Sequence, residues 1–61
     1  MDVRQELERE FNRLLARLQA ETDDPETHAA LRALIRVARA CSTDWGAALG
    51  ARYWGAMITA D

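Results

Sequence analysis

Cysteine and histidine are nearly missing from this chain of 61 residues, which holds one of each, Cys41 and His28. A lone cysteine excludes a disulfide within the chain, and the two residues together fall short of the four nitrogen or sulfur ligands of a structural zinc site. A domain of this size buries only about 60% of the surface that its unfolded chain exposes, so it depends on a disulfide, a metal or association with another chain. Association is the support that we expect here.

Proline and glycine are also scarce, with 1 and 3 residues, and no segment carries the signals of a β-strand. Alanine, leucine, arginine and glutamate dominate instead, and these residues favour helices. The sequence therefore predicts an all-α fold. Lysine is absent, and the 8 basic residues are all arginine. Arginine together with abundant alanine is typical of GC-rich genomes and favours a bacterial or phage origin.

Apolar residues recur every three or four positions through residues 2–21, which predicts an amphipathic helix. They are Val3, Leu7, Phe11, Leu14, Leu15 and Leu18. Glutamates lie toward the start of this segment and arginines further on, an order that suits the helix dipole. We therefore expect a first helix over residues 2–21 with one apolar face.

The turn at residues 22–25 ends this helix and begins another, because the residue before a proline avoids helical angles whereas proline is tolerated at the first helical position. Asp24 is the expected N-cap, and Glu26 adds a favourable charge in the first turn. A connection this short makes the two helices antiparallel neighbours. The sequence thus predicts a helical hairpin, with a second helix over residues 25–42.

This second helix is amphipathic as well, and its apolar side is expected to pack on the first helix. That side consists of Ala30, Leu31, Leu34, Ile35, Ala38 and Cys41. Cys41 is expected to act as a small buried hydrophobe. His28, near the start of the helix, is expected at the surface.

Residues 42–44 leave two structures open. Ser42, Thr43 and Asp44 carry side chains that compete for backbone hydrogen bonds, so the second helix either continues or breaks there and restarts with Thr43 as N-cap. A continuous helix would overhang the hairpin, and its apolar end would have to meet another subunit. A break would give a short third helix that folds back across the pair.

The C-terminal segment, residues 44–58, is the candidate functional region, because apolar residues occupy nearly every side of it and two facing helices cannot cover them all. Aromatic residues dominate interface energetics, and glycines four residues apart let another backbone approach closely. We predict that this surface binds a partner protein. The candidate partner-binding residues are Trp45, Gly46, Leu49, Gly50, Tyr53, Trp54, Met57 and Ile58.

Packing inside the fold is an equal alternative for the glycines, and the aromatic residues, Trp45 first among them, could form the core itself. Arg52 could stack on one of these rings or pair with Asp44, although a solvated side chain is the simpler interpretation. A membrane span is not expected, because the apolar run is shorter than the ~20 residues that a bilayer needs and contains Arg52. The segment therefore predicts a protein contact made inside or outside the chain.

Patterns that indicate catalysis are absent: the sequence offers no nucleophile with a base, no glycine-rich phosphate loop and no metal-ligand spacing. We expect no enzyme, no cofactor and no metal. Arginines on both helices could form a basic face for RNA or for an acidic partner, but interleaved acids and a net charge of -2 argue against nucleic-acid binding. These arginines are Arg9, Arg13, Arg17, Arg32, Arg36 and Arg39.

The hairpin layout resembles one bacterial family. An amphipathic helix and a short turn lead into residues 24–31, DPETHAAL, which open a longer helix. This order looks like the small helical-hairpin co-chaperones of bacterial type III secretion needle proteins. The resemblance implies a small cytoplasmic protein that pairs with a larger helical-repeat chaperone and helps to keep the needle subunit from polymerising early. It implies no cofactor and no catalysis.

Two other functions stay open beside an adaptor or co-chaperone. A homodimeric four-helix bundle could act as a small bacterial or phage regulator that inhibits a target protein by binding it. A nucleic-acid-binding bundle is the third and least favoured function. The single thiol and the absence of signal-peptide features lead us to expect a reducing, cytoplasmic setting for each of them.

Overall fold

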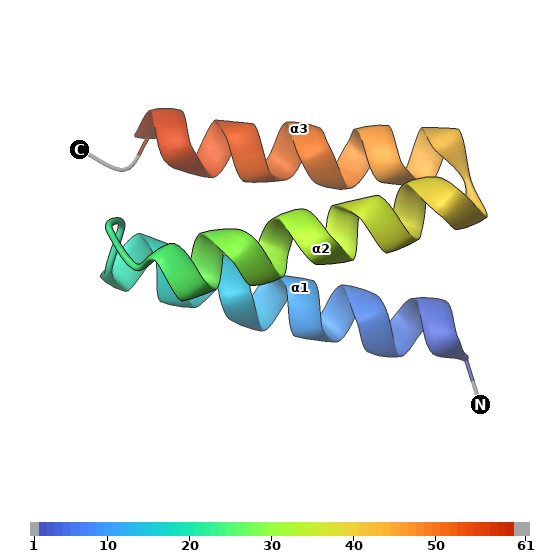
Figure 1. The fold of residues 1–61 in the computed structure, drawn as a ribbon, viewed down its shortest axis with the longest axis horizontal. Helices are drawn as coiled ribbons and strands as arrows, with labels where there is room; N and C mark the ends of the chain where they lie inside the picture. Colours follow the sequence, from blue (N-terminus) through green and yellow to red (C-terminus); the bar gives the residue numbers. More distant parts are fainter. Residues whose placement is uncertain (1, 60–61) are drawn as a thin grey trace.

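The structure is a computed structural model that describes residues 2–59, the last of these by its backbone only. Three helices follow one another, α1 (Val3–Ala20), α2 (Pro25–Cys41) and α3 (Thr43–Thr59). They alternate in direction, and α2 lies between α1 and α3 in Figure 1. The all-α prediction is confirmed, and α1 and α2 form the predicted antiparallel hairpin.

Capping by Asp2 begins α1. Its carboxylate accepts hydrogen bonds from the backbone amides of Arg4 and Gln5, at 3.1 and 3.4 Å. Asp2 and Glu21 both have extended backbone angles and flank the helix as its caps. The observed helix is therefore one residue shorter at each end than the predicted range of 2–21.

Asp24 caps α2, as predicted. Its carboxylate accepts hydrogen bonds from the backbone amide of Glu26 at 3.1 Å and from the hydroxyl of Thr27 at 2.7 Å. Thr27 is buried, and this bond satisfies its hydroxyl. Arg17 of α1 lies 3.8 Å from the same carboxylate, so Asp24 also joins the two helices of the hairpin.

The helix breaks at Ser42, so α2 and α3 are separate helices and residues 42–44 do not lie within one continuous helix. Ser42 has extended backbone angles, and its amide donates to the carbonyl of Ala38 at 2.8 Å, which ends α2. Its hydroxyl accepts from the amide of Trp45 at 3.3 Å, which begins α3. Thr43 was the wrong choice of N-cap, because the hydroxyl that reaches the first turn of α3 belongs to Ser42.

All three helices contribute to one apolar core. Its buried residues are Phe11, Leu14, Leu18, Leu31, Ile35, Ala38, Trp45, Leu49 and Ala56. The expectation that Cys41 is buried was wrong, since Cys41 is exposed. Helical spacing turns it about 120° away from Ile35, to the edge of the apolar stripe of α2.

Gly46 sets the distance between α2 and α3. A Cβ atom at this position would lie 2.6 Å from both Cα and Cβ of Arg39, too close for carbon atoms. A Cβ at Gly50, one turn later, would lie 3.9 Å from Cγ2 of Ile35, an ordinary contact, and at Gly55 it would meet nothing within 4 Å. Gly46 therefore serves close packing inside the chain.

Replacing Gly46 by alanine should destabilise the fold, whereas Gly55→Ala should stabilise it. Overpacking costs about 1–3 kcal/mol, which exceeds the roughly 1 kcal/mol that alanine gains over glycine within a helix. Only the gain applies at Gly55. Urea unfolding followed by circular dichroism measures both free energies of unfolding, and a stabilised Gly46→Ala variant would contradict the close approach of α2 to α3.

The carboxylate of Asp24 should make the stability of the fold depend on pH in the acidic range. The hydrogen bond from Thr27, with help from the Glu26 amide and Arg17, lowers the pKa of Asp24 below its ordinary value of 3.8. A carboxyl whose folded pKa is depressed contributes stability that is complete above its unfolded pKa and is lost as the pH falls through its folded pKa. We expect Asp24→Asn to lower the thermal midpoint near neutral pH, and the gap to the parent to close below pH 3.8.

Asp23→Asn is the matched control for this measurement, because Asp23 makes no hydrogen bond or ion pair with another residue of the range 2–59. Its thermal midpoint should follow that of the parent over the whole titration. A gap for Asp24→Asn that stays constant with pH would show that the charge of Asp24 does not act through its folded partners.

Candidate protein-binding surface

The structure divides the eight candidate residues between the core and the surface. Trp45, Gly46 and Leu49 are buried, Gly50, Tyr53 and Met57 are half-buried, and Trp54 and Ile58 are exposed. The extremes are far apart, since Trp45 is 5% exposed and Trp54 is 61% exposed. The two tryptophans of α3 therefore have different roles, one inside the chain and one outside it.

Trp45 fixes α3 to α1. Its indole Nε1 donates to Oε1 of Glu8 at 2.9 Å, and the guanidinium of Arg4 lies 4.7 Å from the ring centroid. Arg4 and Glu8 in turn approach each other at 4.0 Å. A buried tryptophan needs a partner for its N–H group, and Glu8 supplies it. Trp45 is thus part of the core and is covered by its own chain.

Tyr53 fixes α3 to the other end of the hairpin through His28. Nε2 of His28 lies 2.7 Å from the carbonyl of Thr22, and because a carbonyl only accepts, this nitrogen carries the proton. In the neutral ring Nδ1 then accepts from the hydroxyl of Tyr53 at 2.7 Å. The two rings meet edge to face at 5.9 Å. His28, expected at the surface, is half-buried and ties α3 to the turn between α1 and α2.

The outward side of α3 carries a row of apolar residues. Ala47, Ala51, Trp54 and Ile58 recur at helical spacing and are all exposed, and we call them the outer α3 row. The two alanines were not among the predicted residues, although their spacing from Trp54 would have indicated them.

Arg52 turns its charge away from the outer α3 row and toward α1. Its guanidinium donates to the side-chain carbonyl of Asn12 and lies 5.2 Å from the ring centroid of Phe11. It therefore stacks on a ring of α1, whereas the sequence favoured a solvated side chain and offered a ring of the C-terminal segment or an ion pair with Asp44 as alternatives. Asp44, in the first turn, is the other charged residue of α3.

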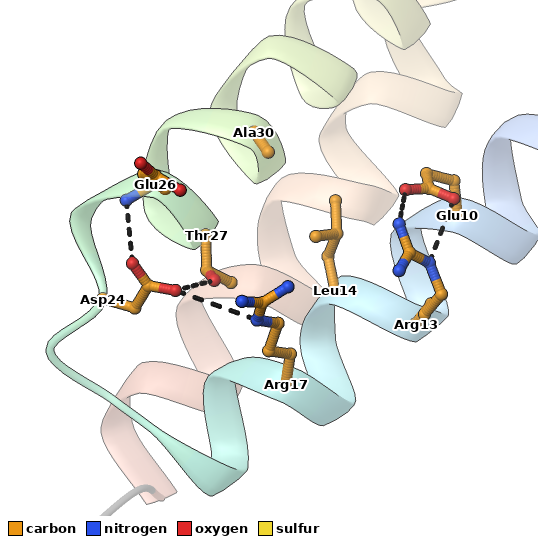
Figure 2. Close-up of a pocket in the computed structure, with 8 residues that line it drawn as sticks. All are labelled: Glu10, Arg13, Leu14, Arg17, Asp24, Glu26, Thr27 and Ala30. Carbon is orange, nitrogen blue, oxygen red and sulfur yellow. Dashed lines mark hydrogen bonds and ion pairs between the residues drawn. The ribbon is translucent and has the colours of Figure 1, made fainter.

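A hollow between α1 and the start of α2 is lined by charged residues, but these residues are occupied by one another. Figure 2 shows Asp24 between Thr27, the Glu26 amide and Arg17. Arg13 binds Glu10 through both of its carboxylate oxygens and lowers the pKa of that carboxyl. The hollow combines helix capping with ion pairing, and the residues that line it include no nucleophile beside a base.

Two other kinds of site are absent from residues 2–59. In this range no three side chains of histidine, cysteine, aspartate or glutamate lie close enough together to hold a metal ion. Nor does this part of the chain contain a helix that is both long and apolar enough to cross a membrane. No protein-family model, curated protein or solved structure matches the chain. The likeness to secretion co-chaperones stays a prediction.

Substitution by alanine should separate the two tryptophans of α3. Trp45→Ala should lower the free energy of unfolding by about 3–5 kcal/mol, because it empties the core and leaves Glu8 without its donor. Trp54→Ala should change it by less than about 0.5 kcal/mol, as expected of an exposed residue. Urea titration of the purified chain at low concentration gives both values, and similar losses for the two variants would contradict the division of α3 into an inner and an outer side.

Proposed function

We propose that this chain is a non-catalytic protein–protein interaction module, an adaptor or co-chaperone that binds a partner protein through the outer α3 row. The observation that carries the proposal is the exposure of Trp54 and Ile58, each 61% exposed. They lie one helical turn apart and so form a single patch. The proposed binding surface contains fewer of the residues predicted from the sequence, because Trp45 and Leu49 are covered by their own chain.

The size of this patch supports a binding role. Covering an exposed tryptophan of this kind removes apolar surface worth about 2–4 kcal/mol from water. A residue that dominates an interface contributes a binding free energy of this size, and tryptophan is among the residue types most often found in that role. The flanking Ala47 and Ala51 are small, so a partner helix can approach the backbone of α3 closely.

A homodimeric regulator is the alternative function. Ala47, Ala51 and Gly55 lie four residues apart along the outward side of α3, and such spacing suits close packing of two helices. In this alternative the outer α3 row of one copy would cover that of a second copy. The experiment below distinguishes the two by the mass of what is bound.

A photo-crosslinking amino acid at position 54, introduced in the native host, should give one discrete crosslinked product. The same group at position 3 is the matched control, because Val3 is an exposed apolar residue, at 68%, on α1. A product of twice the mass of the chain would favour the homodimer, and a heavier product the adaptor. Identical products from the two positions, or none from position 54, would contradict the proposal.

A further inference from the structure

We infer that the partner presents an amphipathic helix with carboxylates along one flank, and that this helix lies across α2 and α3 beside Arg32, Arg36 and Arg39. The inference rests on the proposed function and gives the chemistry of its partner. The outer α3 row would meet the apolar side of that helix, and the three arginines of α2 would meet its acidic flank. The partner helix would complete a bundle of four.

The arginines border the seam between α2 and α3. His28 binds Tyr53, Ile35 approaches Gly50, and Arg39 lies under Gly46, so these three residues of α2 form the row on which α3 lies. Arg32 falls in the same row, four residues after His28, and Arg36 follows one turn after Arg32. All three arginines remain exposed.

The outer α3 row borders the same seam from the other helix. Trp54 lies one turn after Gly50 and Ala47 is next to Gly46, and those two glycines face α2. The core residues Trp45 and Leu49 lie on the opposite side of the seam, where Trp45 meets α1. The arginines and the outer α3 row therefore share the face that α2 and α3 turn away from α1.

Charge on this face is mostly positive, and its arginines have no internal partner. On α1, Arg4, Arg13 and Arg17 approach acidic groups at 4.0 Å or less. By contrast, the side chains of Arg32, Arg36 and Arg39 make no hydrogen bond or ion pair with any residue that the structure describes, and among the arginines of residues 2–59 only Arg9 on α1 shares this property. Between residues 27 and 58 the sequence holds one acidic residue, Asp44. Carboxylates must come from outside.

The shape of the face suits a helix. Arg32 and Arg36 line a shallow hollow together with Ala29 and Ala33, whose small side chains leave room for a helix axis at the usual 8–10 Å or so. Arginines four and seven residues apart are about 6 and 10.5 Å apart along the axis. Glutamates or aspartates at the same intervals on a partner helix would match them, and each pair would be charge-assisted.

A second copy, a lipid surface and a nucleic acid fit this face less well. Two copies packed through this face would bring their arginines close to one another. Each copy offers one acidic residue in return, Asp44, so repulsion between like charges would oppose the contact. Helices that insert into a membrane surface carry large apolar residues, whereas alanine supplies half of the outer α3 row. Apolar residues beside the arginines and the overall charge of -2 disfavour a phosphate backbone.

Selection from displayed helices tests the inference. The probe is a yeast-displayed library of amphipathic helices of 17 residues, the length of α3, with flank positions varied among glutamate, lysine and glutamine. The labelled full chain should enrich glutamate along one flank, and replacing those glutamates by glutamine should weaken binding on the order of tenfold at low salt. Arg32→Glu with Arg36→Glu should shift the enrichment to lysine, while the matched control Arg9→Glu should leave it unchanged.

The outcomes separate this inference from the proposed function. Enriched helices without a carboxylate excess, whose binding is still lost on Trp54→Ala, would overturn the inference and leave the proposed function intact. Absence of enrichment would overturn the inference alone, because the proposed function needs a partner protein but not a helical one. Binding that survives Trp54→Ala would overturn both. Cosedimentation with phosphatidylcholine–phosphatidylserine vesicles that is lost in the Arg32→Glu, Arg36→Glu variant would assign the face to lipid and also overturn the inference. Circular dichroism checks that each variant keeps its helices.

Discussion

The contact between Gly46 and the backbone of Arg39 is the constraint on which the arrangement of α3 depends. It holds the start of α3 against the end of α2 at a distance that no other residue allows. Once that point is fixed, helical spacing decides which residues of α3 turn inward and which turn outward. Trp45 then reaches Glu8 on α1, and Trp54 is left in solvent.

Two polar contacts hold the rest of α3 in place. The indole of Trp45 binds α1 near the chain reversal, and the hydroxyl of Tyr53 binds His28 two helical turns further on. Both join segments far apart in the sequence, by 37 and 25 residues. They give α3 a defined rotation about its axis, which its nearly uniform apolar character would not provide. The outward position of the outer α3 row is a result of that rotation.

Local patterns in the sequence were enough to predict the helices, but not to predict which residues of α3 face the core and which face solvent. The hairpin and the cap at Asp24 could be predicted, because periodicity and capping act within a few residues. The sequence ranked Trp45 ahead of Trp54 as a core candidate but did not separate them, since both lie in the same apolar segment. Their separation depends on the close approach at Gly46 and on Glu8, which lies on another helix. The two serve as core and surface for reasons that no short window contains.

Three smaller errors in the sequence predictions also arose because the arrangement of the helices is not visible in local patterns. Ser42 and Thr43 both offer a hydroxyl at the break, and only backbone geometry shows that the hydroxyl of Ser42 reaches Trp45. The bond between His28 and Tyr53 exists because α3 folds back, so the amphipathic pattern of α2 could not reveal it. Cys41 fell at the edge of a stripe whose width depends on how α1 and α3 cover α2.

The shared cap at Ser42 has a further effect on how α3 meets other molecules. The amide of Ser42 ends α2 and its hydroxyl begins α3, so no flexible linker separates these two helices. A swing of α3 would break both bonds together, along with the packing at Gly46. The exposed indole of Trp54 is therefore presented by a preorganised scaffold. Association through it would sacrifice little conformational entropy, and more of the contact energy would remain as affinity.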